Sequence, residues 1–226
     1  MTAARTVDAV FFDLFGTLLH LAPLDAACDR LSPRRGAEIA ARWRARQLEA
    51  SWLRTAMERW KDFDVVTLDA LRATLQEFGV DGSAHESVLR EVADAFIDLP
   101  LVDGASKVVQ GLRAAGIATG ILTNASSRAL DRVSGRIPPM HHYLSVDAAR
   151  QFKPHPAVYQ LAVDATGLAA QQIGFVTANG WDAAGAGAFG FRVAWLRPGP
   201  TASLPAVGAP EPIVATWPEI VSVFSQ

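Results

Sequence analysis

An aspartate follows an apolar run near the start of the chain and precedes turn-forming residues. Residues 11–19 read FFDLFGTLL, which places Asp13 just before Gly16 and Thr17. A carboxylate that leaves a buried strand at such a turn is positioned to act as a nucleophile at the edge of a sheet. The stretch is therefore typical of a nucleophilic aspartate, and it leaves open which bond Asp13 attacks.

Further polar residues end three later apolar runs. Thr123 and Asn124 end the second run, Lys153 follows the third, and Asn179 and Asp182 follow the fourth. Taken singly, hydroxyl, amide and carboxylate residues at such places are explained as helix caps. Lys153 is not a capping residue, and its positive charge near two carboxylates favours a functional site.

The runs that carry these residues are short and apolar, as expected of buried parallel strands. Helix-like segments separate them at residues 105–116 and 155–167. This alternation predicts an α/β fold with a doubly wound, Rossmann-like parallel sheet, in which ligands bind at the carboxyl ends of the strands. The predicted strands are residues 7–15, 117–124, 142–147, 173–179 and 191–196.

A long helical segment interrupts the alternation. It contains AEIAARWRARQLEASWLRTAMERW and TLDALRATLQEFG, which have helical rather than strand periodicity. We expect a core of residues 1–20 and 100–226 and a helical cap subdomain of residues 21–99, which closes over the carboxyl edge of the sheet. The proline-rich segment 198–212 is predicted to be a surface connection before a last short helix.

Composition limits the function classes. The chain of 226 residues has a net charge of −2 and no run of Lys or Arg, so neither nucleic acid nor a membrane is an expected partner. A single cysteine, Cys28, argues against disulfides and a cysteine zinc site, and the five histidines form no ligand set, so we expect no metal. No signal peptide or 18-residue apolar run is visible, and a cytoplasmic location is expected.

One glycine motif does not fit a nucleotide site. Gly185, Gly187 and Gly190 in GAGAFG satisfy G-x-G-x-x-G, but the dinucleotide fingerprint follows a strand and opens a helix. These glycines precede the strand at 191–196, which predicts the end of a short helix packed closely against the sheet.

Segments spread along nearly the whole chain match one known group in order. They are DLFGTL (13–18), WRARQLEASWLR (43–54), ILTNAS (121–126), LSVDAARQFKPHPAVYQLA (144–162) and FVTANGWDAAGAGAFGFRVAWL (175–196). With them the chain resembles the haloacid dehalogenase superfamily, and more narrowly the L-2-haloacid dehalogenases. The cap motif and the N-x-W-D segment are the most specific, because the superfamily's phosphatases are not expected to share them.

Phe15 stands where the phosphatase pattern D-x-D-G-T has its second aspartate. In phosphatases that acid protonates a departing alkoxide, and Mg²⁺ offsets repulsion between the phosphate and the nucleophile. A halide leaves as a very weak base that needs no proton. Phe15 therefore removes a function that dehalogenation does not use.

The resemblance implies cofactor-independent hydrolysis of short L-2-haloacids to D-2-hydroxy acids. Asp13 forms an aspartyl ester with the substrate, and water activated near Asp182 and Lys153 hydrolyses that ester. Lys153 keeps Asp13 ionised and oriented. Supporting catalytic positions fall on Thr17, Tyr159, Thr177 and Asn179.

Arg44 begins a row of residues spaced by four along the cap, followed by Leu48, Trp52, Ala56 and Trp60. An arginine in such a row is usually an edge residue that extends to solvent. The resemblance instead implies that Arg44 receives the departing halide, with Asn124 as second donor. The remaining binding positions it implies are the N–H groups of Leu14 and Phe15 and the Thr123 hydroxyl for the substrate carboxylate, and Leu48, Phe63 and Trp181 around the alkyl group.

The chain departs from the family pattern at four positions. Phe15 stands where tyrosine is usual, Thr123 and Thr177 replace serines, and Ala45 replaces a polar residue.

Two alternative functions remain open. One alternative is a Mg²⁺-dependent phosphatase of the same superfamily, and the other is a member that binds small anions without turnover. The resemblance also suggests a homodimer.

Overall fold

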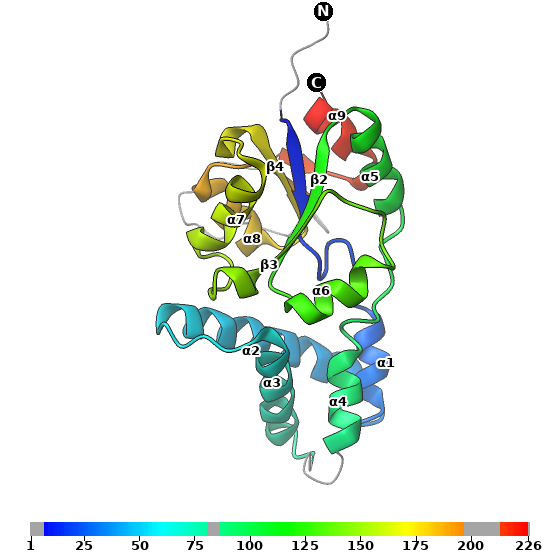
Figure 1. Cartoon of the computed structure of the whole chain (residues 1–226). Helices are drawn as coiled ribbons and strands as arrows, with labels where there is room; N and C mark the ends of the chain where they lie inside the picture. Colours follow the sequence, from blue (N-terminus) through cyan, green and yellow to red (C-terminus); the bar gives the residue numbers. More distant parts are fainter. Residues whose placement is uncertain (1–6, 81–85, 197–212, 226) are drawn as a thin grey trace, which may run out of the picture.

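The computed structural model describes residues 7–80, 86–196 and 213–225 (Figure 1). Its centre is a sheet of six parallel strands in the order β3-β2-β1-β4-β5-β6. The predicted doubly wound α/β fold is therefore confirmed. The strands are β1 (Ala9–Phe12), β2 (Ala118–Thr123), β3 (His142–Ser145), β4 (Ile173–Thr177), β5 (Arg192–Leu196) and β6 (Ile213–Ala215).

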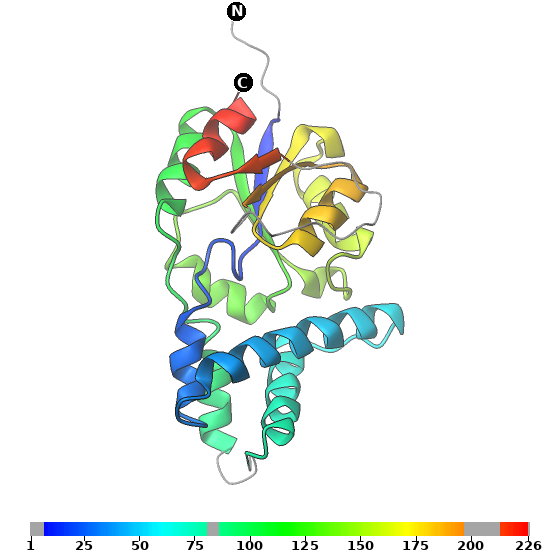
Figure 2. The same cartoon turned by 180° about the vertical axis from the view of Figure 1, so that it is seen from behind.

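Helices cover both faces of the sheet, which explains why its central strands are apolar throughout. On one face lie α5 (Ala105–Ala114) and α9 (Ile220–Ser225), and on the other lie α7 (Pro156–Thr166) and α8 (Gly180–Phe189) (Figures 1 and 2). A further helix, α6 (Ser127–Ser134), packs beside β3. All four residues of β1 are fully buried.

The position of β1 decides where the sheet presents its polar residues. Phe12, the last residue of β1, pairs with Ile121 of β2 on one side and with Val176 of β4 on the other. The chain therefore leaves β1 between the ends of two neighbouring strands. Asp13 follows at once, so residues that end β2 and β4 lie to either side of it.

Among the described residues between β1 and α5, four helices form a cap beneath the carboxyl edge of the sheet (Figures 1 and 2). The long helix α2 runs across that edge, and α3 and α4 descend from it on the far side from the sheet. Their bounds are α1 (Pro23–Asp29), α2 (Gly36–Ala56), α3 (Phe63–Glu77) and α4 (Glu86–Asp94). The limits of the cap at residues 21 and 99 stay a prediction.

The face of α2 that packs inside the cap is not the row that begins at Arg44. The buried residues are Ile39, Trp43, Gln47 and Ser51, spaced by four, with Gly36 and Ala40 beside them. In the predicted row, by contrast, Trp52 is 37% exposed and Ala56 is exposed. The helix also ends at Ala56, before Trp60. Apolar spacing did not mark the row that packs inside the cap, because Gln47 and Ser51 are polar residues buried there.

The two connections between the cap and the core lie side by side. His20 N donates to Pro100 O at 2.9 Å, and Val102 N donates to Leu18 O at 2.8 Å. Leu19 and Leu101 form an antiparallel bridge between these bonds. The chain therefore enters and leaves the cap through one short hydrogen-bonded pair of segments.

The structure also tests the remaining expectations from the sequence. The helices at 105–116 and 155–167 and the last short helix are confirmed as α5, α7 and α9, whereas β6 was not predicted. Cys28 is fully buried and unpaired, and burial raises the pKa of its thiol to about 12. The segment 198–212 lies outside the described residues. Within the described ranges, no helix has the length and apolar character needed to cross a bilayer.

Candidate active site

Three side chains hold the carboxylate of Asp13. Its Oδ2 accepts hydrogen bonds from Thr17 Oγ1 at 2.9 Å and from Asn179 Nδ2 at 2.8 Å. Its Oδ1 accepts one from Lys153 Nζ at 3.1 Å. Asp13 is only 5% exposed, so these donors replace water around a nearly buried carboxylate and fix its direction.

Lys153 joins Asp13 to a second carboxylate. Its Nζ also donates to Asp182 Oδ2 at 2.9 Å, and both Lys153 and Asp182 are fully buried. A buried ammonium is costly unless it is paired and hydrogen-bonded, and here two carboxylates compensate it. Nζ lies, in addition, 4.7 Å from the centre of the Phe175 ring, whose face attracts a cation.

Asp182 lies in the first turn of α8, and its pKa is raised above the usual value of an aspartate. Burial, the largest influence, raises its pKa to about 6; Lys153 lowers it and Asp13 raises it further. Tyr159 OH donates to Asp182 Oδ1 at 2.7 Å. Burial and the neighbouring Asp182 raise the pKa of Tyr159 well above its usual range, so the phenol stays protonated and remains a donor. A carboxylate with a pKa near 6 is suited to act as a general base close to neutral pH.

The turn after β1 places donors around the carboxylate. Gly16 has a φ of +80°, a conformation that glycine adopts readily. Thr17 Oγ1 accepts from Ala178 N at 3.0 Å while it donates to Asp13, so the hydroxyl ties the turn to the end of β4. The backbone N–H groups of Leu14 and Phe15 meet no acceptor in the described part of the chain, which leaves two adjacent donors for an anion.

Two residues at the end of β2 face the same region. Asn124 Oδ1 accepts from Lys153 N at 2.9 Å, whereas Asn124 Nδ2 is buried and has no hydrogen-bond partner within the described ranges. The amide NH₂ of Asn124 is therefore available as a donor to an anion at this edge of the sheet. Thr123 Oγ1 accepts from Ala125 N at 3.1 Å, so its hydroxyl hydrogen is still available as a donor.

Arg44 brings a positive charge from the cap. Its Nη1 donates to Gln47 Oε1 at 2.5 Å. Burial lowers the pKa of Arg44 to about 10 and the charge of Asp13 partly offsets that effect, so the guanidinium is protonated at neutral pH and lies within electrostatic reach of the nucleophile. The site therefore combines a held carboxylate, a second carboxylate with raised pKa, and three groups of donors for an anion.

A family model described as haloacid dehalogenase-like hydrolase matches residues 7–190. The chain is 38% identical over 194 residues to the (S)-2-haloacid dehalogenase of Pseudomonas sp. (strain YL), a match that covers 84% of this chain and 83% of that protein. This chain is a member of the haloacid dehalogenase-like hydrolases, in the L-2-haloacid dehalogenase group.

Two further comparisons also match members of this dehalogenase group. The haloacetate dehalogenase H-2 of Moraxella sp. (strain B) is 33% identical over 196 residues, which cover 85% of this chain and 87% of that protein. The structure of L-2-haloacid dehalogenase from Xanthobacter autotrophicus with chloropropionic acid covalently bound superposes with a TM-score of 0.88 at 30% identity. That match covers 96% of this chain and 98% of the other.

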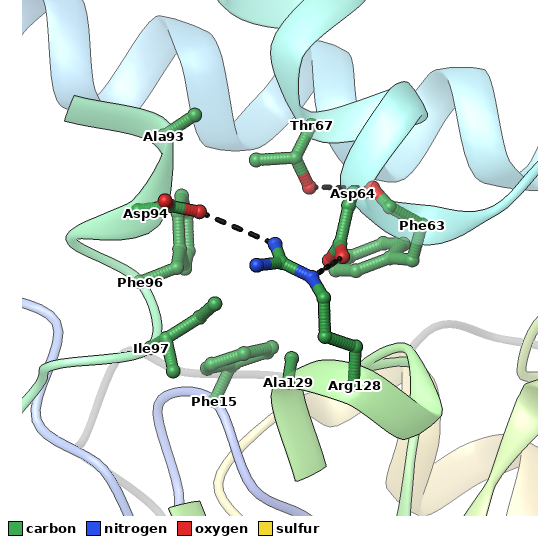
Figure 3. Close-up of a pocket in the computed structure, with 10 residues that line it drawn as sticks. All are labelled: Phe15, Phe63, Asp64, Thr67, Ala93, Asp94, Phe96, Ile97, Arg128 and Ala129. Carbon is green, nitrogen blue, oxygen red and sulfur yellow. Dashed lines mark hydrogen bonds and ion pairs between the residues drawn. The ribbon is translucent and has the colours of Figure 1, made fainter. Parts of the chain in front are cut away.

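Aromatic side chains of the core and the cap meet beside the turn of the dehalogenase that carries Asp13. The Phe15 ring stacks on Phe63 with centroids 6.4 Å apart and meets Phe96 edge-on at 5.4 Å. Figure 3 shows Phe15 and Phe63 on the wall of a small cavity of about 30 Å³, with Arg128 reaching between Asp64 and Asp94. This space takes roughly one or two waters, and apolar rings form part of its wall.

Other expected site residues lie at the periphery of the contacts around Asp13. Thr177 Oγ1 accepts from Asn179 N at 3.1 Å, so its contact is to the backbone that carries Asn179 rather than to a carboxylate. Trp181 meets Trp52 of the cap edge-on, with centroids 5.6 Å apart. Leu48 is half-buried one turn after Arg44 on α2.

Sequence reasoning missed residues that connect the cap to the site. Gln47 accepts from Arg44 and donates to Thr67 within the cap, and the spacing of Gln47 three residues after Arg44 was the signal available. Asp64 of α3 accepts from Ser126 Oγ and from Arg128 Nε, both at 2.9 Å, and so links the cap to the start of α6.

The glycine-rich segment has a packing role in this dehalogenase. A Cβ on Gly185 would lie 2.6 Å from Tyr159 OH and 2.5 Å from Pro154 Cβ, so only glycine lets α8 approach Tyr159 this closely. Gly190 caps α8 with a φ of 111°. The expectation that the motif ends a short helix packed closely is therefore confirmed.

Proposed function

We propose that this chain hydrolyses the carbon–halogen bond of short L-2-haloacids, with Asp13 as the nucleophile. The observation that carries the assignment of Asp13 is its carboxylate, held by Thr17, Asn179 and Lys153 at the end of β1. The (S)-2-haloacid dehalogenases among the relatives, at 32 to 38% identity, support the reaction class.

The substrate binds through its carboxylate. Its donors are the adjacent N–H groups of Leu14 and Phe15 and the hydroxyl of Thr123. These donors are uncharged and so do not repel the substrate carboxylate. Leu48, Phe63 and Trp181 surround the alkyl group. This arrangement turns C2 toward Asp13 and directs the halogen toward Arg44 and Asn124.

In the first step an oxygen of Asp13 attacks C2 from the side opposite the halogen. The new C–O bond forms as the carbon–halogen bond breaks, and the halide leaves with the bonding electron pair, so configuration at C2 inverts. Arg44 and the unpaired Nδ2 of Asn124 donate to the halide as its charge develops. No proton is needed in this step, which agrees with Phe15 in place of an acid.

In the second step water attacks the carboxyl carbon of the Asp13 ester. Asp182 accepts the proton of that water, and Lys153 and Tyr159 hold Asp182 in place. Collapse of the intermediate breaks the bond between the carboxyl carbon and the ester oxygen that Asp13 had supplied. Asp182 returns its proton to the departing alkoxide oxygen, so a D-2-hydroxy acid is released. The second proton of the water passes to solvent as Asp13 regains a carboxylate with one oxygen from water.

Isotope labelling tests the nucleophile. We expect a single turnover of L-2-chloropropionate in ¹⁸O-water with excess enzyme to place one ¹⁸O in the peptide that contains Asp13, and unlabelled oxygen in the lactate. Direct attack by water would label the lactate instead and would overturn the proposal. The same incubation in EDTA should release chloride at an unchanged rate, whereas metal-dependent release of phosphate from phosphomonoesters would favour the phosphatase alternative.

A homodimer in the cytoplasm is proposed as the working form. Trp52, Leu53 and Met57 at the end of α2 are 37%, 52% and 58% exposed, an apolar row that a second copy of the chain would cover. The one cysteine, buried and unpaired, suits a reducing compartment. Light scattering should give twice the mass of one chain, and Leu53→Asp should halve it; a monomeric wild type would contradict the dimer.

A further inference from the structure

Gln47 is a fully buried polar residue in the cap that touches Arg44. It lies on α2, one turn after Arg44, and its Oε1 accepts from Arg44 Nη1 at 2.5 Å. Its Nε2 donates to Thr67 Oγ1 of α3 at 2.6 Å. Both ends of the amide are therefore used, which is the condition for burying such a group at low cost.

The orientation of the amide follows from Thr67. Thr67 Oγ1 donates its single hydrogen to Phe63 O at 2.7 Å, so it can only accept from Gln47. The amide must then present its NH₂ group to Thr67 and its oxygen to Arg44. Trp43 Nε1 donates to Thr67 O at 2.8 Å and ties the same turn of α3 to α2.

We propose that Gln47 is a positioning residue that aims Arg44 at the departing halide and leaves its positive charge intact. Arg44 has several N–H donors in a fixed plane, so an acceptor on Nη1 sets the direction of the others. A neutral amide oxygen does this without the charge pairing that a glutamate would bring. The inference rests on the halide-binding role proposed for Arg44.

Gln47→Glu tests the importance of a neutral acceptor. The glutamate side chain is nearly isosteric with glutamine and still accepts from Arg44, while Thr67 can turn its hydroxyl toward the new carboxylate. We expect kcat/KM for L-2-chloropropionate to fall by about tenfold or more, the scale of one charge-assisted hydrogen bond. The fall for L-2-bromopropionate should be clearly smaller, since bromide is the better leaving group and needs less stabilisation.

Replacement of Thr67 by valine tests the orientation, and Thr74→Val is its matched control. Thr74 is a buried threonine on the same helix whose hydroxyl donates to Ala70 O at 2.8 Å, whereas the side-chain hydrogen bonds of Gln47 in the described residues go to Arg44 and Thr67. We expect Thr67→Val to depress kcat/KM for the chloro substrate more than for the bromo substrate. Thr74→Val should leave the ratio between the two substrates unchanged at a similar loss of thermal stability.

Arg44→Lys separates the failure of this inference from the failure of the halide-binding role. If Arg44→Lys lowers kcat/KM by the same factor for both substrates, the halide-binding role of Arg44 itself is wrong. A second outcome is that Arg44→Lys lowers kcat/KM more for the chloro substrate, while Gln47→Glu and Thr67→Val lower it by the same factor for both. In that case only the positioning role of Gln47 is overturned. Chloride inhibition of the bromopropionate reaction is a second readout, and it should weaken in Gln47→Glu.

Discussion

Lys153 Nζ donates to Asp13 Oδ1 across a distance of 3.1 Å and 140 positions of sequence. The same ammonium donates to Asp182, so one lysine serves both carboxylates of the proposed reaction. The group that orients the nucleophile is thereby also the group that holds the proposed base. Both steps of the reaction should respond to a change at this residue.

Lys153→Met removes the charge but keeps most of the side-chain volume. Two nearly buried carboxylates then face each other without a cation, and we expect the free energy of unfolding to fall by about 3–5 kcal/mol. Activity should fall by about 100-fold or more, as when a preorganised donor is lost. Urea unfolding and chloride release measure the two effects. Lys107→Met, an exposed lysine on α5, is the control, and equal losses in both variants would contradict the prediction.

Asp182 predicts the acid limb of the pH profile. Its pKa is raised to about 6, so the carboxylate loses its charge as the pH falls through about 6. Because a base must be ionised to accept a proton, kcat should decline below that pH and be level above it. Steady-state rates between about pH 4.5 and 8 measure the inflection. Asp182→Asn should release halide in one burst and then stop, and continued turnover with the same profile would exclude Asp182 as the base.

Gly185→Ala tests the close packing of α8 on Tyr159. The added methyl would lie 2.6 Å from Tyr159 OH, so the phenol must move away from Asp182. We expect a stability loss of about 1–3 kcal/mol from overpacking, together with a lower kcat. Gly135→Ala is the control, because nothing lies within 4 Å of its added Cβ and its φ is −74°. Thermal unfolding and kcat are measured for both variants. A Gly185→Ala enzyme with unchanged stability and unchanged kcat would contradict the role of this contact.

Arg128→Ala tests the ion pairs between the core and the cap. Arg128 donates to Asp64 at 2.9 Å and to Asp94 at 3.2 Å, but its side chain is 54% exposed. Exposed pairs are weakened by water and salt, so the variant should lose less than about 1 kcal/mol of stability. Urea unfolding at low and high salt measures this. A loss of several kcal/mol, or one independent of salt, would mean that the pairs hold the cap more strongly than their exposure allows.

The strand-end residues could be predicted because strand order is not needed to place them. Asp13, Asn179 and Asp182 each follow an apolar run, and parallel strands bring such residues to one edge whichever order the strands take. Lys153 lies beyond the end of β3 at Ser145, and its charge, which does not suit a helix cap, was the signal that included it. The pairing of β1 with β2 and β4, which decides which side chains touch, emerges only when the sheet is assembled.

The residues around Arg44 could not be predicted in this way. Gln47 contacts Thr67, which lies on another helix, and that contact depends on how α2 rotates against α3. Apolar periodicity selected the row through Leu48 and Trp52, whereas the buried row contains Gln47 and Ser51. A pattern that counts polar residues as outward-facing cannot find a hydrogen-bonded polar contact inside a cap. The β6 strand was missed because three residues are too short to carry a periodicity.

The paired crossing at Leu19 and Leu101 has a consequence for the catalytic cycle. Asp13, Lys153 and Asp182 are almost closed to solvent, so each substrate must enter, and each product leave, while the cap stands open. Both chain connections pass through a single ladder of backbone hydrogen bonds, which resists twisting and bends most easily about one axis. We therefore expect the cap to open by a hinge rotation about these two segments. Arg44 and its neighbours would then leave the site and return to it together in every turnover.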